Sequence, residues 1–169
     1  MKKIGFTTAC LMCLLIGSAQ AASPQKIGDY NDWSAFSYQE GKNTVCYMAS
    51  IPQKSEGKYT RRGEPYIVIT HRPADKTFDV INFVAGYQYK NEAPIVVKIG
   101  KYSTDDFFAD NDKAWTMNST TDKKLVEEMK KGERLIIDGT SSKGTVTKDY
   151  YSLKGFTAAY RAISAKCRR

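Results

Sequence analysis

The sequence has few of the residues on which common catalytic and metal sites depend. Its 169 residues include one histidine, His71, and four cysteines. A Ser-His-Asp triad would have to use His71, but no G-x-S-x-G elbow accompanies it. We expect His71, which ends a predicted strand, to be an ordinary surface residue. A zinc site needs three or four His or Cys ligands, which this composition does not supply.

Glycine-rich phosphate loops are also missing, and the chain has one long hydrophobic run. Neither a G-x-G-x-x-G nor a Walker pattern occurs. The apolar run from Ile4 to Gly17 is shorter than the roughly twenty residues that a membrane-spanning helix needs. Met1-Lys2-Lys3 precedes the run, and Ser18-Ala19-Gln20-Ala21 ends it in an A-x-A pattern. This order predicts a cleaved secretory signal peptide over residues 1–21 and no transmembrane segment in the mature chain.

Export changes the expected role of the cysteines. Cys10 and Cys13 leave with the predicted signal peptide, so Cys46 and Cys167 remain. Two cysteines in an oxidising compartment usually pair. A reactive thiol would need a neighbouring histidine or a C-x-x-C spacing, and neither of these two cysteines has one. We therefore predict a Cys46–Cys167 disulfide in a soluble protein of the periplasm, the cell surface or the secreted fraction.

Basic residues outnumber acidic ones, with 26 Lys and Arg against 18 Asp and Glu and a net charge of +8. Such an excess favours anionic partners such as lipid headgroups, polysaccharide or nucleic acid. The basic residues are scattered, and no basic stripe interleaved with aromatic residues occurs, which argues against nucleic acid. The polar loop from Pro52 to Gly63 is the strongest candidate for a contact surface. Its predicted partner-binding residues are Lys54, Lys58, Arg61 and Arg62.

The pattern of short hydrophobic runs predicts one domain over residues 22–169. Residues 22–32 are polar and are expected to be irregular. From Trp33 onward, runs of β-branched and aromatic residues alternate with turn signals. The predicted strands are 33–38, 43–51, 65–71, 78–85, 94–102, 114–117, 134–139 and 146–153. Both alternating sets of 66–71 are largely apolar, which predicts a strand covered on both faces. Strands at this spacing favour an all-β fold of the β-sandwich type.

Two segments follow the helical period instead. Leu125 and Met129 lie four residues apart, and Gly132 is a plausible helix stop. Near the end, the apolar residues of 156–163 recur at i, i+3, i+4 and i+7. The β-sandwich is therefore expected to carry one or two short helices.

The acidic stretch from Asp105 to Asp112 is the best metal candidate. Asp106, Asp110 and Asp112 could offer the oxygen ligands that Ca²⁺ prefers, but the stretch lacks the D-x-[DN]-x-[DN]-G loop. The alternative is a polar turn with capping aspartates. We predict no resident metal or cofactor, and keep these three residues as candidates for a metal-assisted hydrolase.

Four motifs together resemble the invasion-associated locus B family of exported alphaproteobacterial proteins. They are Asp32-Trp33, Cys46-Tyr47-Met48, the helix-then-strand block 123–138, and the terminal segment 152–160 before Cys167. The resemblance implies an immunoglobulin-like β-sandwich, a periplasmic or cell-surface location, and a link to host-cell invasion in pathogenic members. It implies no catalytic residues.

These observations predict a non-enzymatic exported binding protein associated with host-cell invasion. Its partner would be a component of the host-cell surface or of the bacterial envelope. The alternative is a periplasmic structural protein with an envelope-maintenance or chaperone-like role.

Overall fold

The computed structural model describes residues 23–168, so the predicted signal peptide lies outside the described residues. In this range the chain forms two antiparallel sheets and two α-helices. The larger sheet contains, in spatial order, β1 (Gln25–Tyr30), β2 (Trp33–Glu40), β3 (Asn43–Ser50), β5 (Tyr66–Arg72), β6 (Thr77–Val84), β10 (Lys113–Thr116) and β9 (Phe107–Asp110). The smaller sheet contains β4 (Lys54–Gly57), β12 (Val146–Ser152), β11 (Arg134–Thr140), β7 (Val96–Ile99) and β8 (Tyr102–Thr104). The helices are α1 (Ser119–Lys131), α2 (Phe156–Lys166) and a short 3₁₀ turn, η1 (Pro73–Asp75), between β5 and β6.

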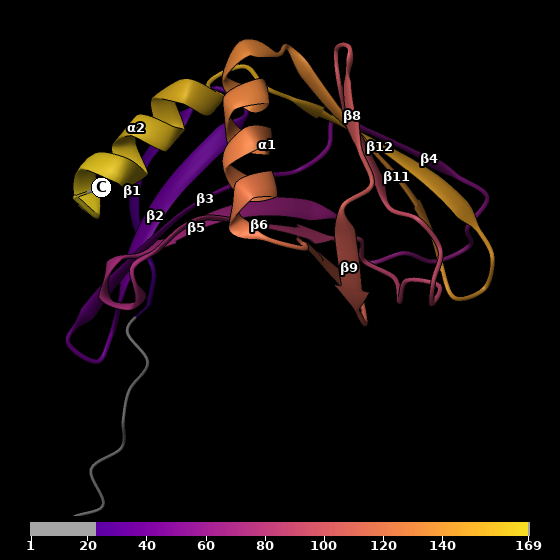
Figure 1. Cartoon of the computed structure of the whole chain (residues 1–169), viewed down its shortest axis with the longest axis horizontal. Coiled ribbons are helices and arrows are strands. Elements are labelled where there is room, and N and C mark those ends of the chain that lie inside the picture. Colours follow the sequence, from indigo (N-terminus) through magenta and orange to yellow (C-terminus); the bar gives the residue numbers. More distant parts are fainter. Residues whose placement is uncertain (1–22, 169) are drawn as a thin grey trace, which may run out of the picture.

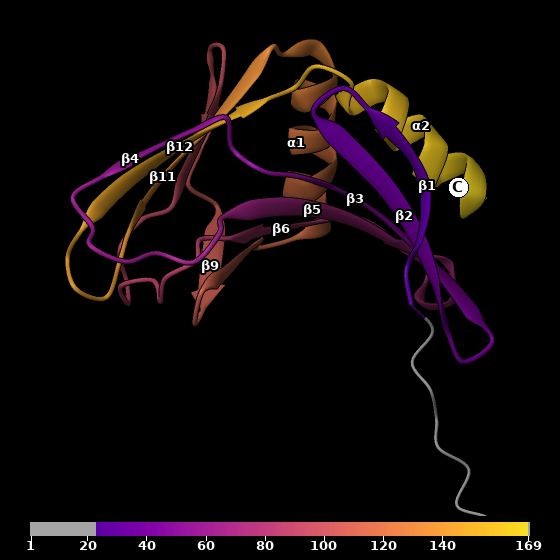
Figure 2. The same cartoon turned by 180° about the vertical axis from the view of Figure 1, so that it is seen from behind.

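The predicted all-β class with two short helices is confirmed. Figures 1 and 2 show both helices on one side of the larger sheet, with the smaller sheet beside α1. Helix α2 contacts β1, β2 and β3, whereas α1 contacts β6 and β10. Side chains from both sheets and both helices belong to one continuous core, which is the arrangement expected of two sheets packed as a sandwich.

An immunoglobulin-like strand order is not confirmed. An immunoglobulin sandwich divides its strands more evenly between two sheets and joins them in Greek keys. Here β1, β2, β3, β5 and β6 lie side by side in chain order, which makes most of the larger sheet a meander.

Alternation along the strands explains which face of the larger sheet is buried. Trp33 and Ala35 on β2, Met48 on β3 and Ile67 and Ile69 on β5 are at most 1% exposed. Successive side chains of a strand point to opposite faces, so these residues share the face that the helices cover. Their burial is the main source of stability for the fold.

Three strands lie outside the predicted set, and one predicted strand is two strands in the structure. Residues 25–30 form β1 along β2, although residues 22–32 were expected to be irregular. Residues 54–57 form β4 along β12, and residues 107–110 form β9 along β10. The predicted strand 94–102 is instead the hairpin of β7 and β8, because the chain turns at Gly100 and Lys101. All three missed strands stand at the edge of a sheet. The sequences of β1 and β4 are mostly polar, and β9 has only four residues, so their partners define them more than their own residues do.

The prediction that β5 is covered on both faces is wrong. Ile67, Ile69 and His71 face the core and are fully buried. The opposite set is only partly covered, with Val68 and Thr70 half-buried and Tyr66 exposed. Within the described residues, the helices and the smaller sheet all pack on one side, so the apolar character of the second set has another cause.

The two predicted helices are confirmed, and their ends follow from local chemistry. Helix α1 begins at Asn118, whose side chain accepts hydrogen bonds from the backbone N–H groups of Thr120 and Thr121 at 3.0 Å. Its last turn carries Lys130 and Lys131, which suit the negative end of the helix dipole, and Gly132 caps it.

Helix α2 begins at a glycine that no other residue could replace without strain. Gly155 has φ of +90°, and an added Cβ would lie 1.8 Å from the carbonyl oxygen of Tyr30. The close approach brings the next residue, Phe156, edge-on against Trp33 with ring centroids 5.0 Å apart. The Trp33 indole N–H donates to the carbonyl of Ser152 at 3.0 Å. These contacts bring β1 and β2 together with β12 and the start of α2.

The predicted disulfide between Cys46 and Cys167 is present. It joins β3 to the C-terminal end of α2, with 6.1 Å between the two Cα atoms and a separation of 121 positions in sequence. Both residues are buried. The bond therefore holds the far end of α2 on the larger sheet, while the Trp33–Phe156 contact holds its near end.

Replacing both cysteines, Cys46→Ala with Cys167→Ala, should lower the free energy of unfolding by about 2–5 kcal/mol, because the unfolded chain regains the entropy of a long open loop. Thermal unfolding followed by circular dichroism would measure the loss. A reducing agent should lower the Tm of the wild type and leave the double variant unchanged. Equal Tm values for the oxidised wild type and the double variant would contradict the role assigned to the bond.

Candidate functional site

A cleft of about 1100 Å³ opens where the chain crosses between the two sheets. Its walls come from loop 58–63, from residues 86–88 after β6, and from the turn between β11 and β12. Part of the predicted contact loop therefore forms one wall, and the opposite wall comes from a segment about 80 residues away in sequence. This volume is close to the upper end of the range that ligand sites in proteins occupy.

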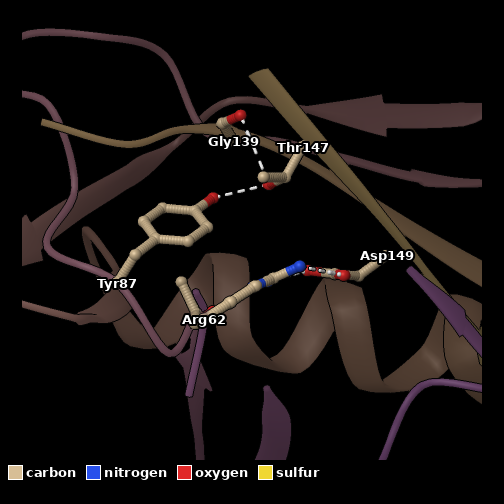
Figure 3. A network of polar contacts seen from close by, with 6 residues as sticks. Arg62, Tyr87, Gly139, Thr147 and Asp149 are labelled. Atoms are coloured by element: carbon tan, nitrogen blue, oxygen red, sulfur yellow. Dashed lines mark hydrogen bonds and ion pairs between the residues drawn. The ribbon is translucent and has the colours of Figure 1, made fainter. Parts of the chain in front are cut away.

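Arg62 contributes to the floor of the cleft, and a buried ion pair with Asp149 lies beneath it. The Arg62 guanidinium donates two hydrogen bonds to the Asp149 carboxylate, at 2.7 and 2.5 Å, and a third from Nε to the carbonyl of Ala85 at 2.7 Å. The two side chains are only 3% and 6% exposed. Two parallel N–H···O bonds fix both position and direction, so this pair holds loop 58–63 against β12 (Figure 3).

Aromatic rings enclose the Arg62 guanidinium. Its central carbon lies 4.9 Å from the ring centroid of Tyr87 and 5.5 Å from that of Tyr59. The Tyr87 hydroxyl is 2.6 Å from the hydroxyl of Thr147, and Figure 3 shows the Tyr87 ring lying beside Arg62 with this hydroxyl directed at Thr147. Burial raises the pKa of Tyr87. Burial alone would lower the pKa of Arg62, but the hydrogen bonds and charge of Asp149 outweigh it and raise that pKa. The Arg62 guanidinium and the Tyr87 hydroxyl therefore both stay protonated.

Two glycines in contact close the base of the loop. The N–H of Gly63 donates to the carbonyl of Gly86 at 2.8 Å. Gly86 has φ of +71°, and a Cβ there would lie 2.3 Å from the carbonyl oxygen of Gly63. No side chain fits between the two backbones, so glycine at position 86 is what lets the loop sit this close.

The rim of the cleft is positively charged. Lys58 and Arg61 stand on the loop and Lys143 stands on the opposite turn, and all three are exposed. Across residues 23–168, none of the three belongs to an ion pair and no acidic side chain lines the cleft. Because Asp149 already neutralises Arg62, these three cations give the opening a net positive charge, which attracts anions.

The predicted contact residues divide into three groups. Lys58 and Arg61 lie on the rim, whereas Lys54 lies on β4, where it pairs with Glu56 at 2.5 Å and sits over the Tyr150 ring. Arg62 is not available as a surface cation, which corrects its place in the predicted set, because the buried Asp149 requires its charge. Sequence reasoning missed Lys143. The run Ser141-Ser142-Lys143-Gly144 gave a turn signal, but nothing in it indicated that the turn faces loop 58–63.

The structure does not bring the three candidate metal ligands together. Asp106 precedes β9 and accepts hydrogen bonds from the side chains of Asn118 and Thr121 near the start of α1. Asp110 ends β9, and an extended strand separates the two by roughly 13 Å. Asp112 lies in the two-residue turn before β10. Among the described residues, no three His, Cys, Asp or Glu side chains gather closely enough to hold a metal ion.

His71 is a core residue, which corrects the expectation of a surface position. Its side chain is fully buried. The backbone N–H of Asp79 donates to its Nδ1 at 3.2 Å, and its Nε2 lies 3.2 Å from the hydroxyl of Ser164 on α2. The Tyr160 ring packs edge-on against it at 5.5 Å. The imidazole thus connects β5, β6 and α2 in the interior.

The fold and the cleft define a two-sheet β protein with a rigid, basic opening at its edge. The family model described as Invasion associated locus B (IalB) protein matches residues 33–164 of this chain. The chain belongs to this family. Neither a search of curated proteins nor a search of solved structures finds a match. In the part of the chain that the structure describes, no helix has the length and hydrophobicity of a membrane span.

Removing the carboxylate under the cleft, Asp149→Ala, should lower the free energy of unfolding by about 3–5 kcal/mol, because the Arg62 charge stays buried without its partner. Chemical denaturation would measure the loss. As a control, Asp138→Ala removes a carboxylate from the more exposed pair with Lys98 on the outer side of the smaller sheet, and should cost about 1 kcal/mol or less. Equal losses in the two variants would show that the buried pair has no special role.

Proposed function

We propose that this protein is an exported, non-enzymatic binding protein that contacts an anionic component of a cell surface through the basic cleft. The observation that carries the proposal is the set of three exposed cations, Lys58, Arg61 and Lys143, around a floor that is already neutral. The buried ion pair and the Gly63–Gly86 contact already fix the loop that carries Lys58 and Arg61, so an anion that binds there orders side chains but not the loop backbone. Hydroxyl groups of Tyr59 and Thr60 on the same wall can add hydrogen bonds.

Family membership supports the biological setting. The chain is an invasion-associated locus B protein, and residues 1–21 have the order of charge, apolar run and A-x-A site that a secretory signal needs. The proposed location is therefore the periplasm, with onward passage to the cell surface or the medium. The proposed role is attachment during host-cell invasion, and the competing role is maintenance of the bacterial envelope.

Charge reversal at the rim tests the role of the cleft. The variant Lys58→Glu, Arg61→Glu, Lys143→Glu should bind bacterial envelope fractions or host plasma-membrane fractions at least about tenfold more weakly than the wild type, a loss of about 1.4 kcal/mol. Co-sedimentation with each fraction would measure it. Wild-type binding should also strengthen at low salt, where the Debye length grows from about 10 to about 30 Å.

The matched control makes the same charge change elsewhere. Lys42, Lys101 and Lys123 are exposed, lie outside the cleft and belong to none of the ion pairs found in the described residues. Their triple change to Glu should leave binding within about threefold of the wild type. If both triple variants lose affinity equally, overall charge and not the cleft governs binding. Retention on the host fraction supports attachment, and retention on the bacterial fraction alone supports envelope maintenance.

A further inference from the structure

The face of the larger sheet that turns away from the helices has an unusual composition for a surface. Alternation places Phe36 and Tyr38 of β2, Tyr47 of β3 and Trp115 of β10 on this face, opposite the buried set. An antiparallel sheet with one face in water normally shows polar side chains there. Figures 1 and 2 show that within the described residues no helix or strand covers this side.

The smaller sheet of the same protein provides the contrast. Its outer side carries a charged ladder, in which Asp138 lies 2.6 Å from the Lys98 ammonium and 3.7 Å from that of Lys148. That is the chemistry of a solvated sheet. The outer side of β11 and β12 carries one aromatic side chain, Tyr150, so the group of four on the larger sheet has no counterpart there.

Side-chain size shapes the aromatic face into a groove. Val68 and Thr70 of β5 and Val80 and Asn82 of β6 form a floor of short side chains. Aromatic side chains stand on both sides, Tyr38 and Tyr47 on one and Trp115 on the other, around a hollow of about 610 Å³. From β3 to β10 is three strand spacings, or roughly 14 Å.

Ring-to-ring contacts hold both walls. Phe36 stacks on Tyr47 with centroids 5.1 Å apart, and Phe108 stacks on Trp115 at 5.6 Å. Phe108 is itself 48% exposed, so its stacking on Trp115 does not place either ring in the core. The walls are thus already assembled in the protein without a ligand.

Charge in the groove is balanced internally. Arg72 is the charged residue that lines it, and its guanidinium pairs with Glu40 at 2.5 Å and donates to the Tyr38 hydroxyl at 3.1 Å. Because the Tyr38 hydroxyl oxygen accepts from Arg72, its O–H group is available to donate to a ligand. The Asn82 amide donates to the carbonyl of Ala114 at 3.2 Å, which leaves its oxygen as an acceptor. An anion would find no cation here that lacks a partner within the described residues, so the groove complements an uncharged ligand.

We propose that this groove binds a neutral glycan chain. Sugar rings present C–H faces that pack on aromatic rings and hydroxyl edges that reach Tyr38, Thr70 and Asn82. An apolar protein segment would instead cover Thr70 and Asn82 and leave their polar groups without water or partners, which costs free energy. A second copy of this chain, whose net charge is +8 over the full sequence, would add electrostatic repulsion. The site is separate from the basic cleft and does not depend on the function proposed for it.

The test uses three linear hexaoses as probes: β-1,4-linked glucose, β-1,4-linked N-acetylglucosamine and α-1,4-linked glucose. Of the two tryptophans, Trp33 is buried and Trp115 lines the groove, so tryptophan fluorescence reports on the site. At least one hexaose should give a saturable change, with a Kd of about 1 mM or tighter by calorimetry. Trp115→Ala should weaken binding at least tenfold. Trp115→Phe keeps a ring and should weaken it less, which covers the case in which the alanine variant does not fold.

Two further variants separate the proposal from its competitors. Thr70→Val keeps the shape but removes a hydroxyl, so it should weaken a glycan several-fold, whereas an apolar partner would bind it more tightly. Tyr59→Ala removes an exposed ring from the basic cleft and should leave hexaose affinity unchanged. Any effect of this variant should fall on the binding of the anionic partner. No binding of any hexaose, or equal affinity in Trp115→Ala, would overturn the proposal. So would a dimer in sedimentation that Trp115→Ala dissociates, because the face would then belong to a second copy.

Discussion

The structure depends on covering one face of a seven-stranded sheet. That face carries Trp33, Met48, Ile67, Ile69 and Phe83, and no single element is wide enough to bury all of them. Helix α2 covers the β1–β3 end and α1 covers the β6–β10 end. The smaller sheet contributes to the rest of the core. The disulfide matters because α2 has 11 residues and is too short to be stable by itself.

The same constraint produces the cleft. After β3 the chain leaves the larger sheet, adds β4 to the edge of the smaller one, and returns as β5. Loop 58–63 is the return crossing, and Arg62 is its one residue that is not exposed. An arginine at this point is stable only if its charge is neutralised and its N–H groups are bonded, and Asp149 on β12 does both. The rim cations Lys58, Arg61 and Lys143 remain exposed around the buried Arg62 guanidinium.

Local pattern was sufficient for the parts of the fold that bury their own residues. Period and turn signals predict the strands around Met48, Ile69 and Ile81 and the two amphipathic helices. In these elements the spacing of the apolar residues itself indicates which face is buried. The strand β4, with the sequence Lys-Ser-Glu-Gly, carries no such signal. It is a strand because β12, which lies about 90 residues away in the chain, offers backbone groups that pair with it. Edge strands of this kind are fixed by their neighbours and not by their own residues.

The wrong expectations for Arg62 and His71 share a physical cause. Arginine is usually exposed and histidine is intermediate in burial, and a sequence shows their type but not their distant partners. Arg62 pairs with a residue 87 positions away and His71 with one 93 positions away. The apolar second face of β5 is the opposite case, because its signal was visible in the sequence but was assigned to a covering layer. Within the described residues the structure places no layer over that face. The apolar second set of β5 therefore forms the floor of the groove, between the aromatic walls, and the partner that we propose for this groove comes from outside the chain.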